Sequence, residues 1–279
     1  METKTNKNII LTIGGVILVV VIGLLIYFAN QPAKNDTSTK TSTTESSKTS
    51  SSSVAGQGTG IDGSQTTQEK LDKSNLPQLT STVSTDEAEV QLQTSLGNID
   101  IKLFPKLAPH AVQNFLALAK EGYYKNNEFF RVINDFMIQT GDPSNKGTGS
   151  KVVSAVNGGK SFDTEISNEL YNIRGAVALA NTGAASSSSS QFFIVQNSQD
   201  MTSQLNNYLR PTKIADAYKK GGYPSLDGSY TVFGQVVSGM DIVDKIASAK
   251  VTTNSSGEAS SPVDPVKIIA VKIVKDWKF

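Results

Sequence analysis

Hydrophobic and polar residues alternate along two short runs, at 90–93 and 99–103. Successive side chains of a strand point to opposite faces, so each run predicts a strand with one buried face. Gly97-Asn98 lies between the runs and favours a hairpin turn. A folded domain is therefore expected to begin near residue 87 and to occupy residues 87–279.

Apolar residues at helical spacing predict two helices. Val112, Phe115 and Ala119 share one face of the segment 109–120, which begins with a helix-favouring proline, and a second helix is predicted at 240–249. Further strands are predicted at 175–180, 191–196, 231–237 and 266–274, and a helix is expected around 206–220 within the connection 197–224. Many short strands with two separated helices favour an antiparallel barrel, with a sandwich as the alternative.

The N-terminal part of the chain has a different composition. After a short tail, residues 1–8, an uncharged apolar run at 9–29 is long enough to cross a bilayer as a helix. We interpret it as a transmembrane anchor or uncleaved signal; a cleavable secretory signal is the alternative, although its apolar region is normally shorter. Residues 30–86 are rich in Ser, Thr and Gly and predict a disordered linker, because such side chains cannot offset the entropy lost on ordering.

Lysines flank the apolar run on both sides, and the nearest ones favour a cytoplasmic N-terminus without settling the orientation. That orientation places the domain across the membrane. We therefore expect a single-pass protein of the cell membrane, with its folded domain on the extracellular side. A cysteine-free domain is compatible with such a location.

The chain has 279 residues, a formal net charge of +1, no cysteine and one histidine, His110. A near-neutral chain without a basic stripe gives no support to nucleic-acid binding. The missing cysteines exclude disulfides and thiol nucleophiles, and with one histidine they exclude most zinc sites. We expect no metal and no cofactor, and we interpret His110 as a solvated residue at a helix start.

One arginine and one glutamine stand among apolar residues in the segment 129–142. A guanidinium cannot discharge itself, so Arg131 should either pair with a carboxylate in the interior or line an apolar cleft, and we favour the cleft. Asn134-Asp135 interrupts the alternation and predicts a bend or bulge. We expect this bend to bring four side chains toward one cavity: Arg131, Phe136, Met137 and Gln139.

Four motifs follow one another between about residues 88 and 275. They are the segment Phe129 to Asp142, Ala178-Leu179-Ala180-Asn181, Ser190-Gln191-Phe192-Phe193-Ile194, and the segment Leu226 to Gly234. In this order they resemble the motifs of the cyclophilins, which are peptidyl-prolyl cis-trans isomerases. The resemblance implies a mainly β fold, a closed eight-stranded antiparallel barrel capped by two α-helices, and it leaves the anchor and linker uncovered.

The resemblance also implies roles for ten residues. Arg131 resembles the catalytic arginine and Gln139 the glutamine beside it. The residues that resemble the proline pocket are Phe136, Met137, Phe193 and Leu226. The residues expected to line the groove and bind substrate are Ala180, Asn181, Gln191 and Tyr230.

Three positions depart from the family pattern. Phe130 and Tyr230 stand where many members carry histidine, and Ser225 stands where cyclosporin-sensitive members carry tryptophan. We therefore expect weak cyclosporin binding with isomerase activity retained. The loop 182–190 is rich in serine and one residue longer than the family pattern, and we interpret it as a mobile surface loop.

The expected function is faster rotation about X-Pro bonds, which assists the folding of exported proteins. The expected partners are proline-containing polypeptides and the membrane, and the chain is expected to be a monomer. A guanidinium that donates to the proline nitrogen would stabilise the twisted amide more than the planar one. Two alternatives stay open: a non-catalytic proline-peptide-binding module of the cell envelope, and a structural strand in which Arg131 only pairs with a carboxylate.

Overall fold

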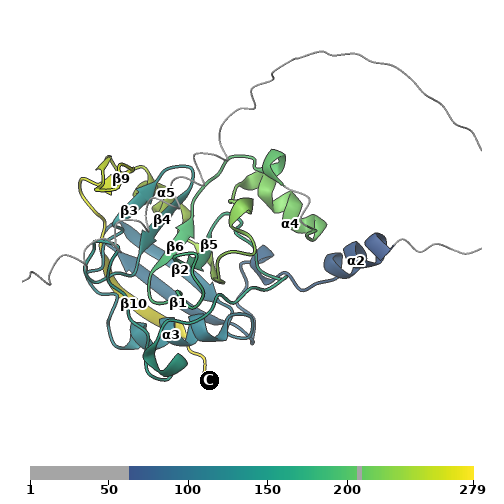
Figure 1. Ribbon diagram of the computed structural model, residues 1–279, viewed down its shortest axis with the longest axis horizontal. Coiled ribbons are helices and arrows are strands. Elements are labelled where there is room, and N and C mark those ends of the chain that lie inside the picture. The colour runs from purple at the N-terminus through teal and green to yellow at the C-terminus, as the bar shows by residue number, and fades with distance from the viewer. Residues whose placement is uncertain (1–62, 206–208) are drawn as a thin grey trace, which may run out of the picture. The chain divides into compact units, whose positions relative to one another are not determined.

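The computed structural model describes residues 63–205 and 209–279 (Figure 1). The chain divides into two units, residues 1–67 and the folded unit 68–279. Its main sheet contains β1 (Ala88–Thr94), β2 (Gly97–Leu103), β3 (Arg131–Ile133), β4 (Met137–Thr140), β5 (Ala176–Leu179), β6 (Phe192–Val195), β7 (Val232–Ser238) and β10 (Ile268–Lys275). Two more strands, β8 (Val251–Thr253) and β9 (Ala259–Pro262), form a separate hairpin.

The α-helices of the described residues are α2 (Gly63–Asp72), α3 (Pro109–Lys120), α4 (Thr212–Ala217) and α5 (Met240–Ala247). Short 3-10 segments lie at η1 (Pro77–Leu79), η2 (Asn157–Gly159), η3 (Thr202–Gln204), η4 (Tyr218–Lys220) and η5 (Pro224–Leu226). The two predicted long helices are therefore present, and the second ends two residues earlier than expected.

The eight strands of the main sheet follow the order β10-β1-β2-β7-β5-β6-β4-β3, with antiparallel neighbours, and the sheet curls into a half-barrel. The prediction of a closed barrel is wrong, because β10 and β3 end the order without pairing as strands. An isolated bridge between Glu128 and Lys267 joins the segments next to them. Beside this bridge, Asn126 N–H donates to the Ile268 carbonyl at 2.8 Å and Phe129 N–H donates to the Val266 carbonyl at 2.9 Å, so β10 and the residues before it contact the segment that precedes β3.

The first hairpin forms as the alternation predicts, but its turn is displaced. β1 ends at Thr94 and β2 already begins at Gly97, so Ser95 and Leu96 make the turn. Gly97 is required for a different reason, since its φ is 143° and an added Cβ would lie 2.6 Å from Ile242 Cδ1. The glycine thus marks a close contact between β2 and α5.

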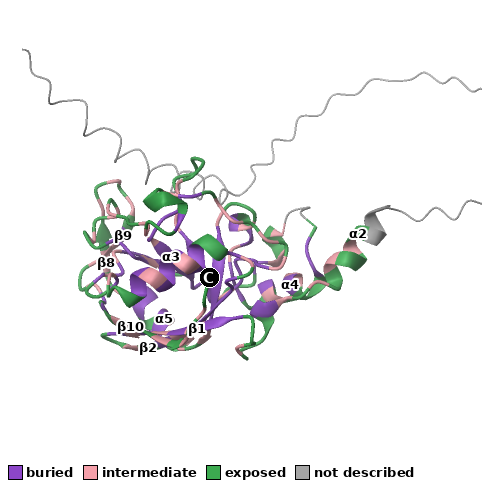
Figure 2. Ribbon diagram, turned by 90° about the horizontal axis from the view of Figure 1, so that it is seen from below, coloured by how far each residue is buried: buried purple, intermediate pink, exposed green. Residues whose placement is uncertain are grey.

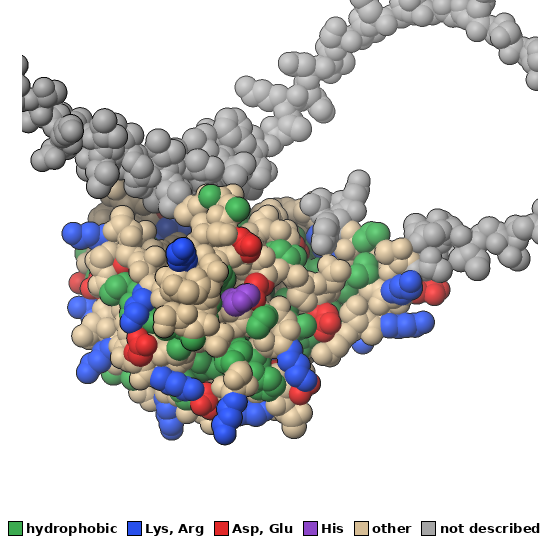
Figure 3. Space-filling view, turned by 60° about the horizontal axis from the view of Figure 1, so that its bottom comes forward, with side chains coloured by type: hydrophobic (Ala, Val, Ile, Leu, Met, Phe, Trp, Pro, Cys, Tyr) green, Lys and Arg blue, Asp and Glu red, His purple; other side chains and the backbone are tan. Residues whose placement is uncertain are grey.

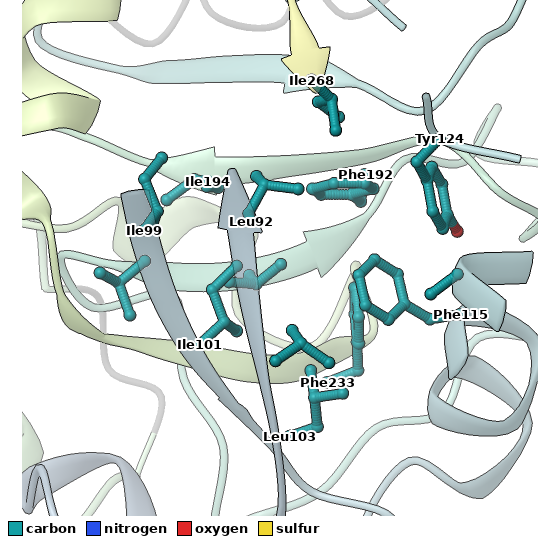
Figure 4. Packing of buried hydrophobic residues seen from close by; sticks show 14 of the residues in the cluster. Leu92, Ile99, Ile101, Leu103, Phe115, Tyr124, Phe192, Ile194, Phe233 and Ile268 are labelled. Carbon is teal, nitrogen blue, oxygen red and sulfur yellow. The ribbon is translucent and has the colours of Figure 1, made fainter. Parts of the chain in front are cut away.

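The core lies between the concave face of the sheet and the helices α3 and α5 (Figure 2). Ten of its members are labelled in Figure 4, contributed by strands, helix α3 and the segment that follows it: Leu92, Ile99, Ile101, Leu103, Phe115, Tyr124, Phe192, Ile194, Phe233 and Ile268. The ring of Phe115 contacts Tyr124, Phe192 and Phe233, with centroids 5.0–5.5 Å apart. The predicted apolar helix face therefore packs directly onto the sheet.

Helix α3 begins with Pro109, and a carboxylate from a distant loop satisfies its first amides. Glu165 accepts hydrogen bonds from the backbone N–H groups of His110 and Ala111, both at 3.0 Å. A negative charge at this end of a helix also interacts favourably with the helix dipole. His110 is exposed there, at the first turn of the helix, as the sequence predicts.

Ordered structure begins before residue 87, inside the range 30–86 that the sequence assigns to a linker. Gln78 is buried at the end of this range, and its side-chain amide pairs with the backbone N–H and C=O of Tyr171 at 2.7 and 2.9 Å. It also donates to Gln235 Oε1 at 2.9 Å. These buried hydrogen bonds hold the segment against the domain, a non-local contact that composition cannot indicate.

None of the helices in residues 63–205 and 209–279 combines the length and apolar character needed to cross a membrane. The expected anchor at 9–29 lies outside the described residues. Figure 3 shows basic and acidic side chains interspersed over one face of the molecule, without a large patch of one sign. This mixture agrees with the near-neutral net charge of the sequence.

The long connection 197–224 forms a small second core beside the half-barrel. Two of its buried apolar members come from the segment before β5 and the others from the connection itself. They are Tyr171, Ile173, Met201, Ile214 and Tyr218. The Tyr218 hydroxyl donates to the buried carboxylate of Asp227 at 2.7–2.8 Å, and burial raises the pKa of that carboxyl. The helix expected near 206–220 is shorter, and residues 206–208 lie outside the described part.

Candidate active site

Arg131 and Gln139 face each other across a tight hairpin. The segment that the sequence treats as one bent strand forms two, β3 and β4, in which Arg131 pairs with Gln139 and Ile133 with Met137. Asp135 makes the turn between them with a left-handed φ of 56°. Directly opposed residues share a face, so the hairpin register achieves the convergence that the sequence attributes to a bend or bulge.

The Arg131 side chain is almost buried and forms a bidentate ion pair. Its Nε and Nη2 donate to the two carboxylate oxygens of Glu258 at 2.7 and 2.8 Å, and the residue is 9% exposed. Burial disfavours the charged form of Glu258 and raises its pKa. The hydrogen bonds and positive charge of Arg131, with a hydrogen bond from Ser260, outweigh the effect of burial, so the pKa of Glu258 is lowered. Arg131 therefore pairs with a carboxylate, which is the alternative that we did not favour from the sequence.

The other end of the guanidinium faces Gln139 and two apolar side chains. Nη1 of Arg131 donates to Gln139 Oε1 at 3.3 Å and lies 3.8 Å from the Met137 sulfur. The guanidinium carbon is 5.9 Å from the centre of the Phe136 ring. The four side chains that the sequence brings together, Arg131, Phe136, Met137 and Gln139, are thus neighbours in the structure.

Gln139 connects the arginine to the loop that follows β4. Its Nε2 donates to Gln191 Oε1 at 3.1 Å, and Gln191 Nε2 in turn donates to the backbone oxygens of Gly147 and Gly149 at 3.1 and 2.8 Å. Each amide therefore acts as both donor and acceptor in one chain of hydrogen bonds. Such a chain fixes the orientation of the Gln139 oxygen toward Arg131.

Aromatic rings extend the apolar surface next to this polar chain. Phe193, which faces Gln139 in the strand register, makes an edge contact with Tyr230 at 5.5 Å. Burial raises the pKa of the Tyr230 hydroxyl, while the charge of Arg131 acts in the opposite direction. Tyr230 therefore lies within the electrostatic reach of Arg131. On the other side, Phe136 contacts Tyr223 with centroids 4.5 Å apart.

The last three predicted residues, Ala180, Asn181 and Leu226, donate hydrogen bonds to main-chain carbonyl groups. The N–H of Ala180 donates to the Gln191 carbonyl at 2.9 Å, and Asn181 Nδ2 donates to the carbonyl of Ser229 at 2.9 Å. Leu226 is buried, and its N–H donates to the carbonyl of Tyr223 at 3.1 Å. Of these three residues, Ala180 contacts the hydrogen-bonded chain of Arg131, Gln139 and Gln191 directly, whereas the bonds of Asn181 and Leu226 go to other residues.

Two residues of this region have no counterpart among the sequence predictions. Glu258 is separated from Arg131 by 127 positions and lies on a hairpin turn that the sequence does not predict. Tyr223 comes from the long connection, whose contact with Phe136 could not be foreseen. The local sequence around Glu258 and Tyr223 does not indicate either contact, because both contacts arise from the packing of segments that are distant in sequence.

Comparisons with known proteins give a consistent result. Residues 89–273 match the model of the cyclophilin type peptidyl-prolyl cis-trans isomerase/CLD family. A protein of Staphylococcus aureus (strain COL), provisionally named as a peptidyl-prolyl cis-trans isomerase, is 42% identical over 203 residues, which cover 71% of this chain and 98% of that protein. A relative from Staphylococcus saprophyticus with the same provisional name is 40% identical over 205 residues, covering 72% and 99%.

Solved structures agree with these sequence matches. The crystal structure of a cyclophilin type peptidyl-prolyl cis-trans isomerase from Cryptosporidium parvum aligns with a TM-score of 0.53 and 29% identity, covering 68% of this chain and 99% of that one. The fold, the order of the motifs and the family model therefore point to the same family.

Proposed function

The chain belongs to the cyclophilin-type peptidyl-prolyl cis-trans isomerases, and we propose that Arg131 supplies the catalytic donor and that the substrates are exported proteins. One observation carries the first part of the proposal. The Nη1 group of an almost buried guanidinium lies beside Gln139 and Met137, and the guanidinium carbon is 5.9 Å from the centre of the Phe136 ring. A strong donor next to apolar side chains is the arrangement that rotation about a prolyl bond requires.

The chemistry follows from the electronic structure of the amide. Resonance between nitrogen and carbonyl gives a rotation barrier of about 18–20 kcal/mol. Twisting the bond returns the lone pair to the proline nitrogen, where Arg131 Nη1 donates a hydrogen bond that the planar amide cannot accept. This bond stabilises the twisted state selectively and therefore raises kcat.

Gln139 has two roles in this proposal. Its Oε1 accepts from Arg131, and one Nε2 hydrogen is used by Gln191. We assign the second Nε2 hydrogen to the carbonyl oxygen of the residue that precedes proline. The bond chain through Gln191 holds the amide in place for this contact, so binding requires little rearrangement.

The proline ring is assigned to four apolar side chains, Phe136 and Met137 next to Arg131, and Phe193 and Leu226. Each is at most 7% exposed, so its position is fixed by packing. One of the similar structures, the Cryptosporidium parvum protein, was determined in the presence of the dipeptide Ala-Pro. We carry the same substrate class, proline-containing peptides, over to this chain.

The catalytic assignment is tested by Arg131→Ala in the full chain, assayed with an X-Pro peptide. We expect kcat/KM to fall on the order of 10²-fold, the usual loss when one transition-state donor is removed. Lys120→Ala is the matched control, because it removes a cation whose carboxylate partner, Asp276, is also on the surface. Unchanged turnover in a folded Arg131→Ala variant would contradict the assignment, and tight peptide binding without turnover in the wild type would favour the binding module.

The cellular part of the proposal rests on the apolar run at 9–29 and the lysines near it. We propose a single-pass membrane protein with the isomerase domain outside and a monomeric chain. Protease added to intact cells should then degrade the domain, while a cytoplasmic marker protein survives. Degradation of the domain only after lysis would contradict this topology.

A further inference from the structure

The carboxylate of Glu258 contacts one edge of the Arg131 guanidinium. Both of its oxygens are used, for Nε at 2.7 Å and Nη2 at 2.8 Å. The two side chains are 11% and 19% exposed, so solvent screens the pair only weakly. A planar guanidinium held by two parallel hydrogen bonds cannot turn about its own axis without breaking both.

The hairpin that carries Glu258 is itself well fixed. Asn254 Oδ1 accepts from the N–H groups of Ser256 and Glu258 at 2.9 and 3.0 Å, and its Nδ2 donates to Ser260 at 3.1 Å. Gly257 adopts the left-handed φ of 83° that closes the turn. β9 packs beside β3, and this contact places the Glu258 carboxylate next to Arg131 (Figure 1).

The division of the guanidinium donors has a functional consequence. Glu258 takes Nε and Nη2, whereas Nη1 points to Gln139 and Met137. We propose that Glu258 is a positioning residue, which fixes the plane of Arg131 so that Nη1 faces the prolyl nitrogen. This inference rests on the proposed catalytic role of Arg131, and it assigns to the β8–β9 hairpin a part in catalysis.

Positioning is favoured over inhibition by the side on which Glu258 binds. An inhibitory carboxylate would occupy the donor that faces the apolar side chains, yet that donor contacts Gln139 instead. The arginine side chain has several rotatable bonds. Without Glu258 the guanidinium of Arg131 would therefore sample other orientations, and the orientation that places Nη1 toward the prolyl nitrogen would be populated less. The loss should therefore appear in kcat more than in KM, since the bond to the prolyl nitrogen forms only in the twisted state.

The test compares four variants of the full chain, Glu258→Ala, Glu258→Gln, Arg131→Ala and the Arg131→Ala/Glu258→Ala double variant, on one X-Pro peptide. We expect Glu258→Ala to lower kcat about tenfold with KM changed less than about twofold. Glu258→Gln keeps one acceptor oxygen and should fall between Ala and wild type. Asp276→Ala removes a surface carboxylate paired with Lys120 and serves as the matched control.

Two further readouts separate positioning from a structural effect. In the Arg131→Ala background, Glu258→Ala should cost no further activity, because its effect passes through the arginine. The Arg131 Nε–H resonance should be protected from exchange in the wild type and lose that protection in Glu258→Ala, while the backbone amide spectrum outside the hairpin is unchanged.

Three results would overturn the inference. They are wild-type kcat in a folded Glu258→Ala variant, a kcat above wild type, which would make Glu258 an inhibitor, and an equal loss in both arginine backgrounds. If Arg131→Ala itself keeps full activity, the catalytic assignment fails, whatever Glu258 does. The two failures are therefore distinguishable.

Discussion

At the scale of single residues, the predictable part of the site is the part that is local in sequence. Arg131 and Gln139 lie eight positions apart in one hairpin, whose register pairs them directly, and the turn-forming pair Asn134-Asp135 between them predicts that they converge. Glu258 lies 127 positions after Arg131, in a run of small polar residues without hydrophobic periodicity. Its contact with Arg131 depends on the packing of β9 beside β3, which only the tertiary structure shows.

The Arg131–Glu258 pair also predicts a pH dependence of stability. Because the folded pKa of Glu258 lies below its ordinary value of 4.5, the unfolded chain binds more protons between the two values. The stabilisation is complete above pH 4.5 and is lost as the pH falls through the lower, folded pKa. Denaturant unfolding of wild type and Glu258→Gln should therefore differ most near neutral pH and converge in acid. A difference that stays constant with pH would contradict this.

At the scale of elements, the strands and helices with a clear hydrophobic periodicity are present in the structure. The irregular segments have no such periodicity, so the sequence does not predict how they fold. The runs at 90–93 and 99–103 form β1 and β2, and the 109–120 helix has the predicted bounds. The β8–β9 hairpin escapes prediction because its strands are short and show no alternation of buried and exposed residues. The connection 197–224 folds onto non-local partners, which no local pattern encodes.

That connection contributes to the site through Tyr223. Its ring lies 4.5 Å from the Phe136 ring, between centroids, and its backbone is fixed by a hydrogen bond to the Asn172 carbonyl at 2.8 Å. We expect Tyr223→Ala to raise KM for X-Pro peptides about fivefold, since an aromatic pair contributes about 1 kcal/mol and supports the surface for the proline ring. Tyr223→Phe keeps the ring and should match wild type in steady-state kinetics. Equal losses in both variants would assign the effect to the hydroxyl.

At the scale of the whole molecule, the fold class follows from the sequence and the closure of the barrel does not. Alternating strands and two amphipathic helices are enough for a mainly β domain with helices packed on the sheet. Whether β3 and β10 pair as strands is a non-local property: in the structure, β10 and the residues before it contact the segment 126–129 that precedes β3. The departures at Phe130, Ser225 and Tyr230 flank the site and leave the Arg131 hairpin intact.

The central claim is that the Arg131 guanidinium lowers the barrier to rotation about a prolyl bond. Its most direct measurement is the cis-trans exchange rate of an X-Pro peptide at equilibrium, by NMR, with catalytic amounts of full-length wild type and Arg131→Ala. We expect fast exchange with wild type and a rate near that of the peptide alone with the variant. Equal exchange rates with both folded proteins would contradict it.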